Sequence, residues 1–128
     1  MPKGTYWANQ VCNELNGKSL FIALSSTVIS ASGDGITEPS VGAGYSRYAI
    51  PLNAWGTAAG GSVANLNPFT FNPATALWLS GNPVIYFALL DSGNNLYYFN
   101  QIPPAFQRVW GGGDVPSFSS GVLVIQEN

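Results

Sequence analysis

The sequence contains no histidine and only one cysteine, Cys12, in 128 residues. Without histidine the chain cannot build a Ser-His-Asp or Cys-His catalytic unit. A single cysteine cannot form a disulfide within the chain. We therefore expect no catalytic residue, no metal ion and no cofactor.

Charged residues are also scarce, at 8% of the chain, against about 25% in an average soluble protein. Four are basic and six are acidic, for a net charge of −2. A nucleic-acid binder or a membrane-surface helix needs a concentrated basic face, which four scattered cations do not provide. No apolar run approaches the roughly 18 residues of a membrane span. We expect neither nucleic acid nor membrane as a partner.

What is present points to one globular domain covering residues 1–128. Apolar residues make up 46% of the chain, and 15 glycines and 9 prolines imply many turns. The first residues, MPKGTYWANQ, lack the apolar run of a signal peptide. We expect the protein to be made and folded in a cytoplasm.

A single helix is predicted over 5–16. Thr5 is a candidate N-cap, Trp7, Val11 and Leu15 recur every four residues, and the following Gly17 favours termination. A helix this short is marginal alone and must dock on something. It can pack on its own sheet or act as an arm against a neighbouring subunit.

Short apolar runs between turn-forming residues predict strands in the rest of the chain. The segment 84–90 has the pattern of a central strand, paired with 96–102 across a turn at 91–95. Seven to nine such strands favour an all-β fold, an antiparallel β-sandwich of jelly-roll type. The strands are expected at 20–24, 45–52, near 63, and at 69–71, 84–90, 96–102, 108–110, 115–118 and 122–126, and 27–30 is a possible further strand.

Three segments have a partial likeness to ligand sites. The turn at 91–95 is oxygen-rich but lacks the distal acid of a calcium loop, so an Asx turn is predicted. The segment 111–114 (GGGD) lacks the remainder of a phosphate loop. Asp34 and Glu38 lie in a glycine-rich loop, not on a rigid element, which argues against a catalytic carboxylate pair.

Two groups of side chains stand out as candidates. Glu38 and Arg47 flank one loop, with Tyr45 nearby, and are either a structural ion pair or solvated charges. Aromatic residues are numerous, and Tyr and Trp are frequent at interface centres, where they could contact a partner or stack on carbohydrate. The alternative for each is ordinary core packing. The interface candidates are Trp7, Trp55, Tyr97, Tyr98 and Trp110.

The order of several short motifs resembles a family of small tailed-phage virion proteins often labelled tail fibre protein. Two positions depart from it: Leu79 stands where the family usually has Gly after the Trp, and Asn95 is inserted in a Gly-Asn-Leu turn. The resemblance covers about residues 38–121. It is carried by Glu38…Gly44-Tyr45-Ser46-Arg47, by Phe71-Asn72-Pro73-Ala74-Thr75…Trp78, by Phe87-Ala88-Leu89-Leu90-Asp91…Gly93-Asn94…Leu96 and by Asp114…Phe118…Gly121.

The resemblance implies a virion β-sandwich without a catalytic site, in which Glu38, Tyr45, Arg47 and Asp91 have structural roles. From it we expect a capsid decoration (cement) protein on the capsid exterior, bridging subunits of the major capsid protein, since the chain shows no shaft or heptad stem. The alternative is a tail-fibre module that grips a host-surface glycan. The scarcity of charge also favours self-association as a dimer or trimer, because close packing then desolvates few ions.

Overall fold

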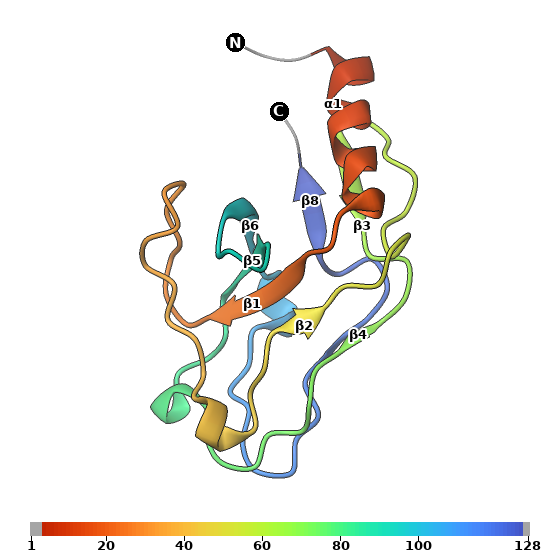
Figure 1. The fold of residues 1–128 in the computed structure, drawn as a ribbon. Helices are drawn as coiled ribbons and strands as arrows, with labels where there is room; N and C mark the ends of the chain where they lie inside the picture. Colours follow the sequence, from red (N-terminus) through yellow and green to blue (C-terminus); the bar gives the residue numbers. More distant parts are fainter. Residues whose placement is uncertain (1–3, 127–128) are drawn as a thin grey trace.

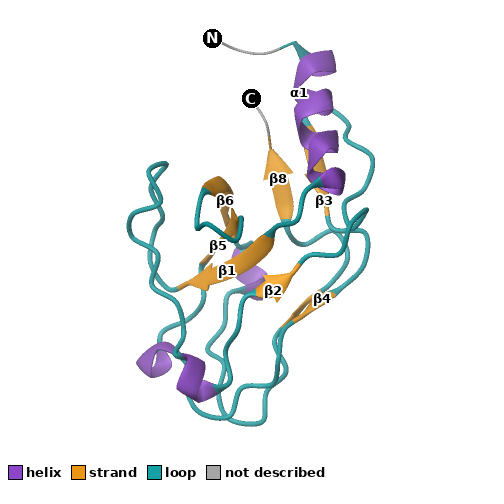
Figure 2. Ribbon diagram, in the orientation of Figure 1, coloured by secondary structure: helices purple, strands orange, loops and turns teal. Residues whose placement is uncertain are grey.

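The computed structural model describes residues 4–126, in which one short helix leads into a body of short antiparallel strands (Figures 1 and 2). The prediction of an all-β protein with one N-terminal helix is confirmed. The helical segments are α1 (Thr5–Asn13) and the 3-10 turns Glu14–Gly17, Val41–Ala43, Leu79–Gly81 and Pro104–Phe106. The strands are β1 (Phe21–Ser25), β2 (Tyr48–Ala49), β3 (Ser62–Ala64), β4 (Phe69–Thr70), β5 (Tyr86–Leu90), β6 (Leu96–Gln101), β7 (Ser117–Phe118) and β8 (Val124–Gln126).

The main sheet has the strand order β2-β1-β5-β6, and every neighbouring pair is antiparallel. The apolar strand β5 lies between β1 and β6, as the sequence predicted for a central strand. It forms a hairpin with β6, with Leu89 opposite Tyr98 and an irregularity before Leu90. Two further two-stranded ladders, β3-β8 and β4-β7, complete the fold.

The two central strands of the main sheet, β1 and β5, bury side chains on both faces. One face contributes Ile22, Leu24, Phe87 and Leu89 to the large core, which also contains residues of both two-stranded ladders. The sheet and the ladders therefore form two layers around one apolar interior, as expected for a sandwich. The opposite face carries a small satellite cluster around Ala23, Ile29, Ala88 and Leu90.

Three strand predictions were wrong or too long. The segment 27–30 is not a strand, because the Ser25 hydroxyl accepts hydrogen bonds from the backbone N–H groups of Thr27 and Thr37 and holds the chain in a local loop. The segment 108–110 is reduced to one bridge between Arg108 and Val84. The strand predicted at 45–52 is only the two residues of β2.

The buried face of α1 is rotated from the predicted one. Ala8, Cys12 and Leu15 are buried, whereas Trp7 is exposed. Small side chains at 8 and 12 let the helix approach the chain before β3, and the Cys12 thiol lies 3.4 Å from the Gly61 carbonyl oxygen. The N-cap is Gly4 rather than Thr5, and it makes no side-chain capping bond.

Three asparagines fasten this helical segment to the irregular loop that precedes β3. The side-chain oxygens of Asn9, Asn13 and Asn16 accept hydrogen bonds from backbone N–H groups of that loop, at 2.7, 3.1 and 2.9 Å. The donors are Gly61, Ala58 and Trp55. The amides thus satisfy N–H groups that a strand partner would satisfy in a regular sheet.

We expect Asn16→Ala to lower the free energy of unfolding by about 1–3 kcal/mol, because the half-buried N–H of Trp55 loses its acceptor. Urea denaturation monitored by circular dichroism measures this change. Gln10→Ala on the exposed side of α1 is the matched control and is expected to change stability by less than about 0.5 kcal/mol. Equal effects of the two substitutions would contradict the anchoring role.

Candidate functional site

Glu38 and Arg47 form a two-pronged ion pair. The Arg47 Nε and Nη2 atoms donate to Oε1 and Oε2 of Glu38, each at 3.0 Å. Both side chains are largely but not fully covered, with 24% of Glu38 and 30% of Arg47 exposed. Arg47 Nη1 also donates to the Asn94 side-chain oxygen at 2.6 Å, which ties the pair to the β5–β6 turn. The sequence left open whether Glu38 and Arg47 form a structural ion pair or are solvated charges, and the structural ion pair is confirmed.

The hydroxyl group of Tyr45 joins this ion pair to the main sheet. It donates to Glu38 Oε1 at 2.6 Å and accepts from the backbone N–H of Leu24 at 3.1 Å. Strand β2 pairs only with Phe21 and Ile22 of β1. Further along β1, at Leu24, the Tyr45 hydroxyl accepts the hydrogen bond that a carbonyl of a neighbouring strand would otherwise accept.

The environment fixes the charge state of each member of the cluster. Partial burial tends to raise the pKa of Glu38, but hydrogen bonds from Arg47 and Tyr45 outweigh it and hold the pKa below its ordinary value. Burial and the neighbouring Glu38 carboxylate raise the pKa of Tyr45 far above its usual range. The hydrogen bond to Glu38 likewise raises the pKa of Arg47. The cluster is therefore a carboxylate, a neutral phenol and a guanidinium at neutral pH.

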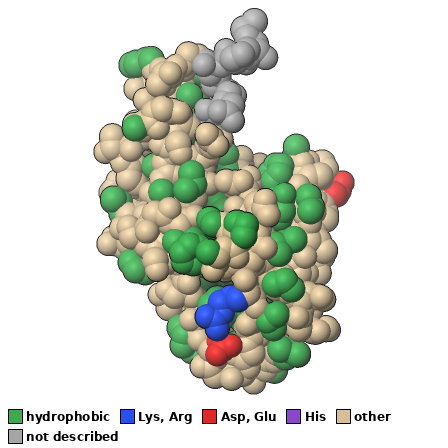
Figure 3. Space-filling model, turned by 180° about the vertical axis from the view of Figure 1, so that it is seen from behind, with side chains coloured by type: hydrophobic (Ala, Val, Ile, Leu, Met, Phe, Trp, Pro, Cys, Tyr) green, Lys and Arg blue, Asp and Glu red, His purple; other side chains and the backbone are tan. Residues whose placement is uncertain are grey.

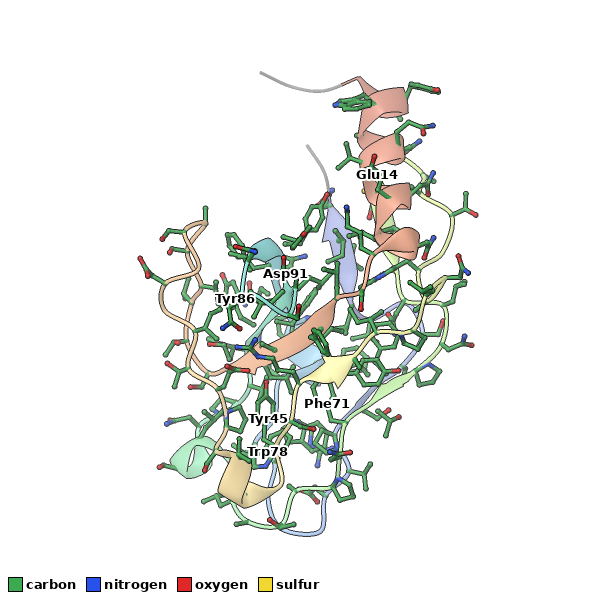
Figure 4. All side chains as sticks on the ribbon, viewed as in Figure 1. Glu14, Tyr45, Phe71, Trp78, Tyr86 and Asp91 are labelled. Carbon is green, nitrogen blue, oxygen red and sulfur yellow. The ribbon has the colours of Figure 1, made fainter. Side chains whose placement is uncertain are left out.

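The next motif packs against Tyr45, and Figure 4 shows its residues Phe71 and Trp78 beside Tyr45. Gly44 has φ +89°, and a Cβ there would lie 2.5 Å from the Pro73 carbonyl oxygen, so no larger residue fits. The preceding carbonyl of Ala43 accepts from the Thr75 N–H at 2.8 Å and from Trp78 Nε1 at 3.0 Å. The Trp78 ring is buried and stands at right angles to the Tyr45 ring.

The departure at Leu79 has a structural counterpart. Leu79 has φ +55°, in the left-handed region that glycine adopts without strain. A glycine at this position, as is usual in the family that the sequence resembles, would remove that strain. Leu79 adopts this conformation in the turn after Trp78 at the local energetic cost that a side chain brings there.

The Asp91 carboxylate organises the β5–β6 turn. Oδ1 accepts from the N–H groups of Gly93 and Asn95, both at 2.9 Å, and Oδ2 accepts from Asn95 Nδ2 and the Tyr97 hydroxyl, at 3.0 and 3.3 Å. These bonds, from Asn95 above all, lower the pKa of Asp91. The predicted Asx turn is confirmed, and all four acceptor positions of the carboxylate are used within the turn.

One cavity of about 530 Å³ is lined by all four residues of the structural motif, which are Glu38, Tyr45, Arg47 and Asp91. Its walls are mainly apolar, and its ionised groups bond to one another or to the turn. Neither Glu38 nor Asp91 has the raised pKa of a general acid. Among residues 4–126, no three potential metal ligands cluster. The lining residues are Phe21, Glu38, Pro39, Val41, Tyr45, Ser46, Arg47, Asp91 and Ser92.

Two of the five interface candidates are core residues. Trp55 is buried with its ring edge-on to Phe69, and Trp110 is buried beneath the Arg108 guanidinium, 4.1 Å from the ring centre. The prediction that they contact a partner is corrected, because their side chains offer almost no surface. Trp7 and Tyr97 are exposed, and Tyr98 packs half-buried against the core.

Sequence reasoning missed the apolar part of the cavity. Phe21 looked like an ordinary strand residue, and Val41 lay in a loop rich in Gly and Ser. Neither position carries a pattern that marks it, because the cavity forms only where the loop folds back beside β1. The asparagines of α1 and of the 3-10 turn that follows it did leave a signal, since positions 9, 13 and 16 recur at helical spacing.

The fold and this cluster define a small all-β protein with few charged residues. Its structural motif of Glu38, Tyr45, Arg47 and Asp91 is held together by hydrogen bonds. The chain belongs to the family described as "Podophage GP4 fiber I protein gp80", whose model matches residues 4–126. The family is one of phage virion structural proteins described as fibre proteins, in agreement with the resemblance seen in the sequence. No curated protein matches the chain. No helix within residues 4–126 is long and apolar enough to cross a membrane.

We expect Tyr45→Phe to destabilise the protein by about 1–3 kcal/mol, because the Leu24 N–H loses its acceptor and Glu38 loses a donor. Chemical denaturation measures the loss, and hydrogen exchange at Leu24 should accelerate more than exchange at Ala88. Tyr6→Phe removes a hydroxyl from an exposed ring and is the control. Unchanged stability in Tyr45→Phe would show that the hydroxyl does not support β1.

The lowered pKa of Glu38 predicts how its contribution depends on pH. The stabilisation is fully present above the ordinary value of 4.5 and is lost as the pH falls through the lower folded-state value. Glu38→Gln should therefore reduce stability by about 1 kcal/mol at pH 7, and the deficit should shrink below pH 4.5. Denaturation curves across this range test it, with the exposed Asp34→Asn as control. A deficit that stays constant down to pH 3 would contradict the pair.

Proposed function

We propose that this chain is a non-enzymatic structural subunit of the phage particle that works through protein–protein contacts. The observation that carries the proposal is the character of its surface. Twelve large apolar side chains are exposed in residues 4–126, while charged groups are few. Figure 3 shows one face on which apolar and uncharged polar groups predominate and charged side chains are isolated.

Such a surface suits lasting contact with other proteins. Single exposed apolar residues are normal on any protein, but the near absence of charges around them is not. Burying this surface requires little desolvation of ions, which is a main cost when charged surfaces meet. Depletion of charge together with exposed aromatic residues is typical of interface cores.

A tail-fibre position is supported by the family to which the chain belongs, which is described as a fibre protein. In that role the exposed rings of Trp7 and Tyr97 are available to stack on a host-surface glycan. The position is a proposal for this chain, and so is any glycan ligand.

Capsid decoration is the second candidate. Here the subunit would bind the major capsid protein on the capsid exterior and bridge neighbouring capsomers. The exposed apolar residues occur on α1, on β6 and in several loops, so contacts with more than one neighbour are possible. Many weak contacts on a lattice gain strength through multivalency.

A reconstruction of the intact virion distinguishes the two positions. Density for this fold confined to the tail, in a small number of copies, is the outcome expected for a fibre subunit. Density at equivalent positions over the shell would instead assign it to decoration, and particles lacking it should then lose DNA at lower temperature than wild type. Absence of the chain from purified virions would contradict the structural role altogether.

A further inference from the structure

Two apolar features of this chain have no covering partner within residues 4–126: the cavity beside the Glu38–Arg47 pair and the exposed N-terminal end of α1. We propose that copies of the chain associate head to tail, with Tyr6 and Trp7 of one copy seated in the cavity of the next. The inference rests on the proposed structural role and gives it a specific contact.

The chemistry of the cavity favours an apolar occupant over a sugar. Phe21, Pro39 and Val41 form its apolar walls. The Asp91 carboxylate has all four acceptor positions filled, and the Tyr45 hydroxyl both donates and accepts within the fold. A saccharide needs unfilled donors and acceptors for its hydroxyl groups, and few remain here. An aromatic side chain requires none.

The N-terminal end of α1 supplies such side chains. Tyr6 is 77% exposed and Trp7 is 56% exposed, because the helix buries its other face through Ala8 and Cys12. Figure 1 shows this end of α1 projecting from the body, and Figure 4 places the cavity residues Tyr45 and Asp91 within the body, away from that end. The aromatic pair therefore cannot fill the cavity of its own chain and needs a second copy.

The two surfaces are also complementary in charge. The N-cap Gly4 makes no side-chain capping bond and the first turn of α1 holds no acidic residue, so the positive end of the helix dipole is uncompensated. At the cavity, the carboxylates of Glu38 and Asp91 outnumber the one guanidinium of Arg47. The helix end and the cavity edge therefore attract each other, and with a net charge of −2 the copies repel only weakly.

The geometry determines the kind of assembly. The helix end and the cavity are different surfaces, so the contact is heterologous and either closes into a ring or continues as a filament. Two aromatic side chains bury roughly 150–250 Å² each, against about 800 Å² per partner in a standard interface. A single contact is therefore weak, and assembly requires a high protein concentration, whether in a concentrated solution or in the particle.

Tryptophan fluorescence and sedimentation of the full chain test the contact. Trp7 is the exposed tryptophan, while Trp55, Trp78 and Trp110 are buried, so acrylamide quenching reports mainly on Trp7. Wild-type protein should show quenching that decreases as concentration rises, together with oligomers larger than a monomer. Trp7→Ala and Val41→Lys should each weaken association at least about tenfold, as for a central interface residue. Val115→Ala, at another exposed apolar position, should leave it unchanged.

A mixture of the two variants identifies the symmetry. Trp7→Ala retains the cavity and Val41→Lys retains the aromatic end, so together they should form heterodimers and nothing larger. Association that survives in both variants, or wild-type protein that stays monomeric with Trp7 fully quenchable at the highest soluble concentration, would overturn the proposal. If a host polysaccharide protects the Val41 backbone N–H from hydrogen exchange and the protein does not self-associate, the cavity is a glycan site. That result would overturn the proposal as well. None of these outcomes depends on where the virion reconstruction places the chain.

Discussion

The fold depends on one buried hydroxyl group, that of Tyr45. It closes the gap along β1 where β2 ends, and it holds the Glu38 carboxylate that binds Arg47. Its ring packs against Trp78, whose indole N–H is bonded to the Ala43 carbonyl. Sheet pairing, the ion pair and the aromatic core thus meet at a single side chain. This explains why the sequence motif combines an acid, a tyrosine and an arginine without implying catalysis.

In other parts of the fold, uncharged polar side chains form the hydrogen bonds to backbone groups that neighbouring strands would form in a regular sandwich. Several strands are only two or three residues long, so many backbone groups lack a ladder partner. Buried Asn65 supplies four hydrogen bonds: its amide nitrogen donates to three carbonyls and its oxygen accepts from the Leu123 N–H. The asparagines of α1 and of the 3-10 turn after it act similarly on the loop before β3. Amides do this without the desolvation penalty of a buried ion.

The sequence predicted best where local pattern and tertiary packing agree. The apolar run of β5, the turn centred on Asp91 and the N-terminal helix each carry their own signal and lie where expected. Prediction was poorest where side chains override backbone preference, as where Ser25 bends the chain after β1. The buried positions of Trp55 and Trp110 could not be read from their loop-like surroundings. The cavity depends on contacts between β1, the 38–47 loop and the β5–β6 turn, which no local pattern encodes.

The cations that the structure describes all make contacts within their own fold. Of the three cations in residues 4–126, Arg47 binds Glu38, Arg108 lies over the ring of Trp110, and Lys18 lies over the ring of Tyr97. Such engagement places each cation against its own fold and leaves the described surface with little uncommitted positive charge. Long-range electrostatic steering toward a partner is then weak. Recognition must come from shape, apolar contact and local charge complementarity at short range. Association of this kind is slow for a freely diffusing pair but adequate for subunits held close together on one particle.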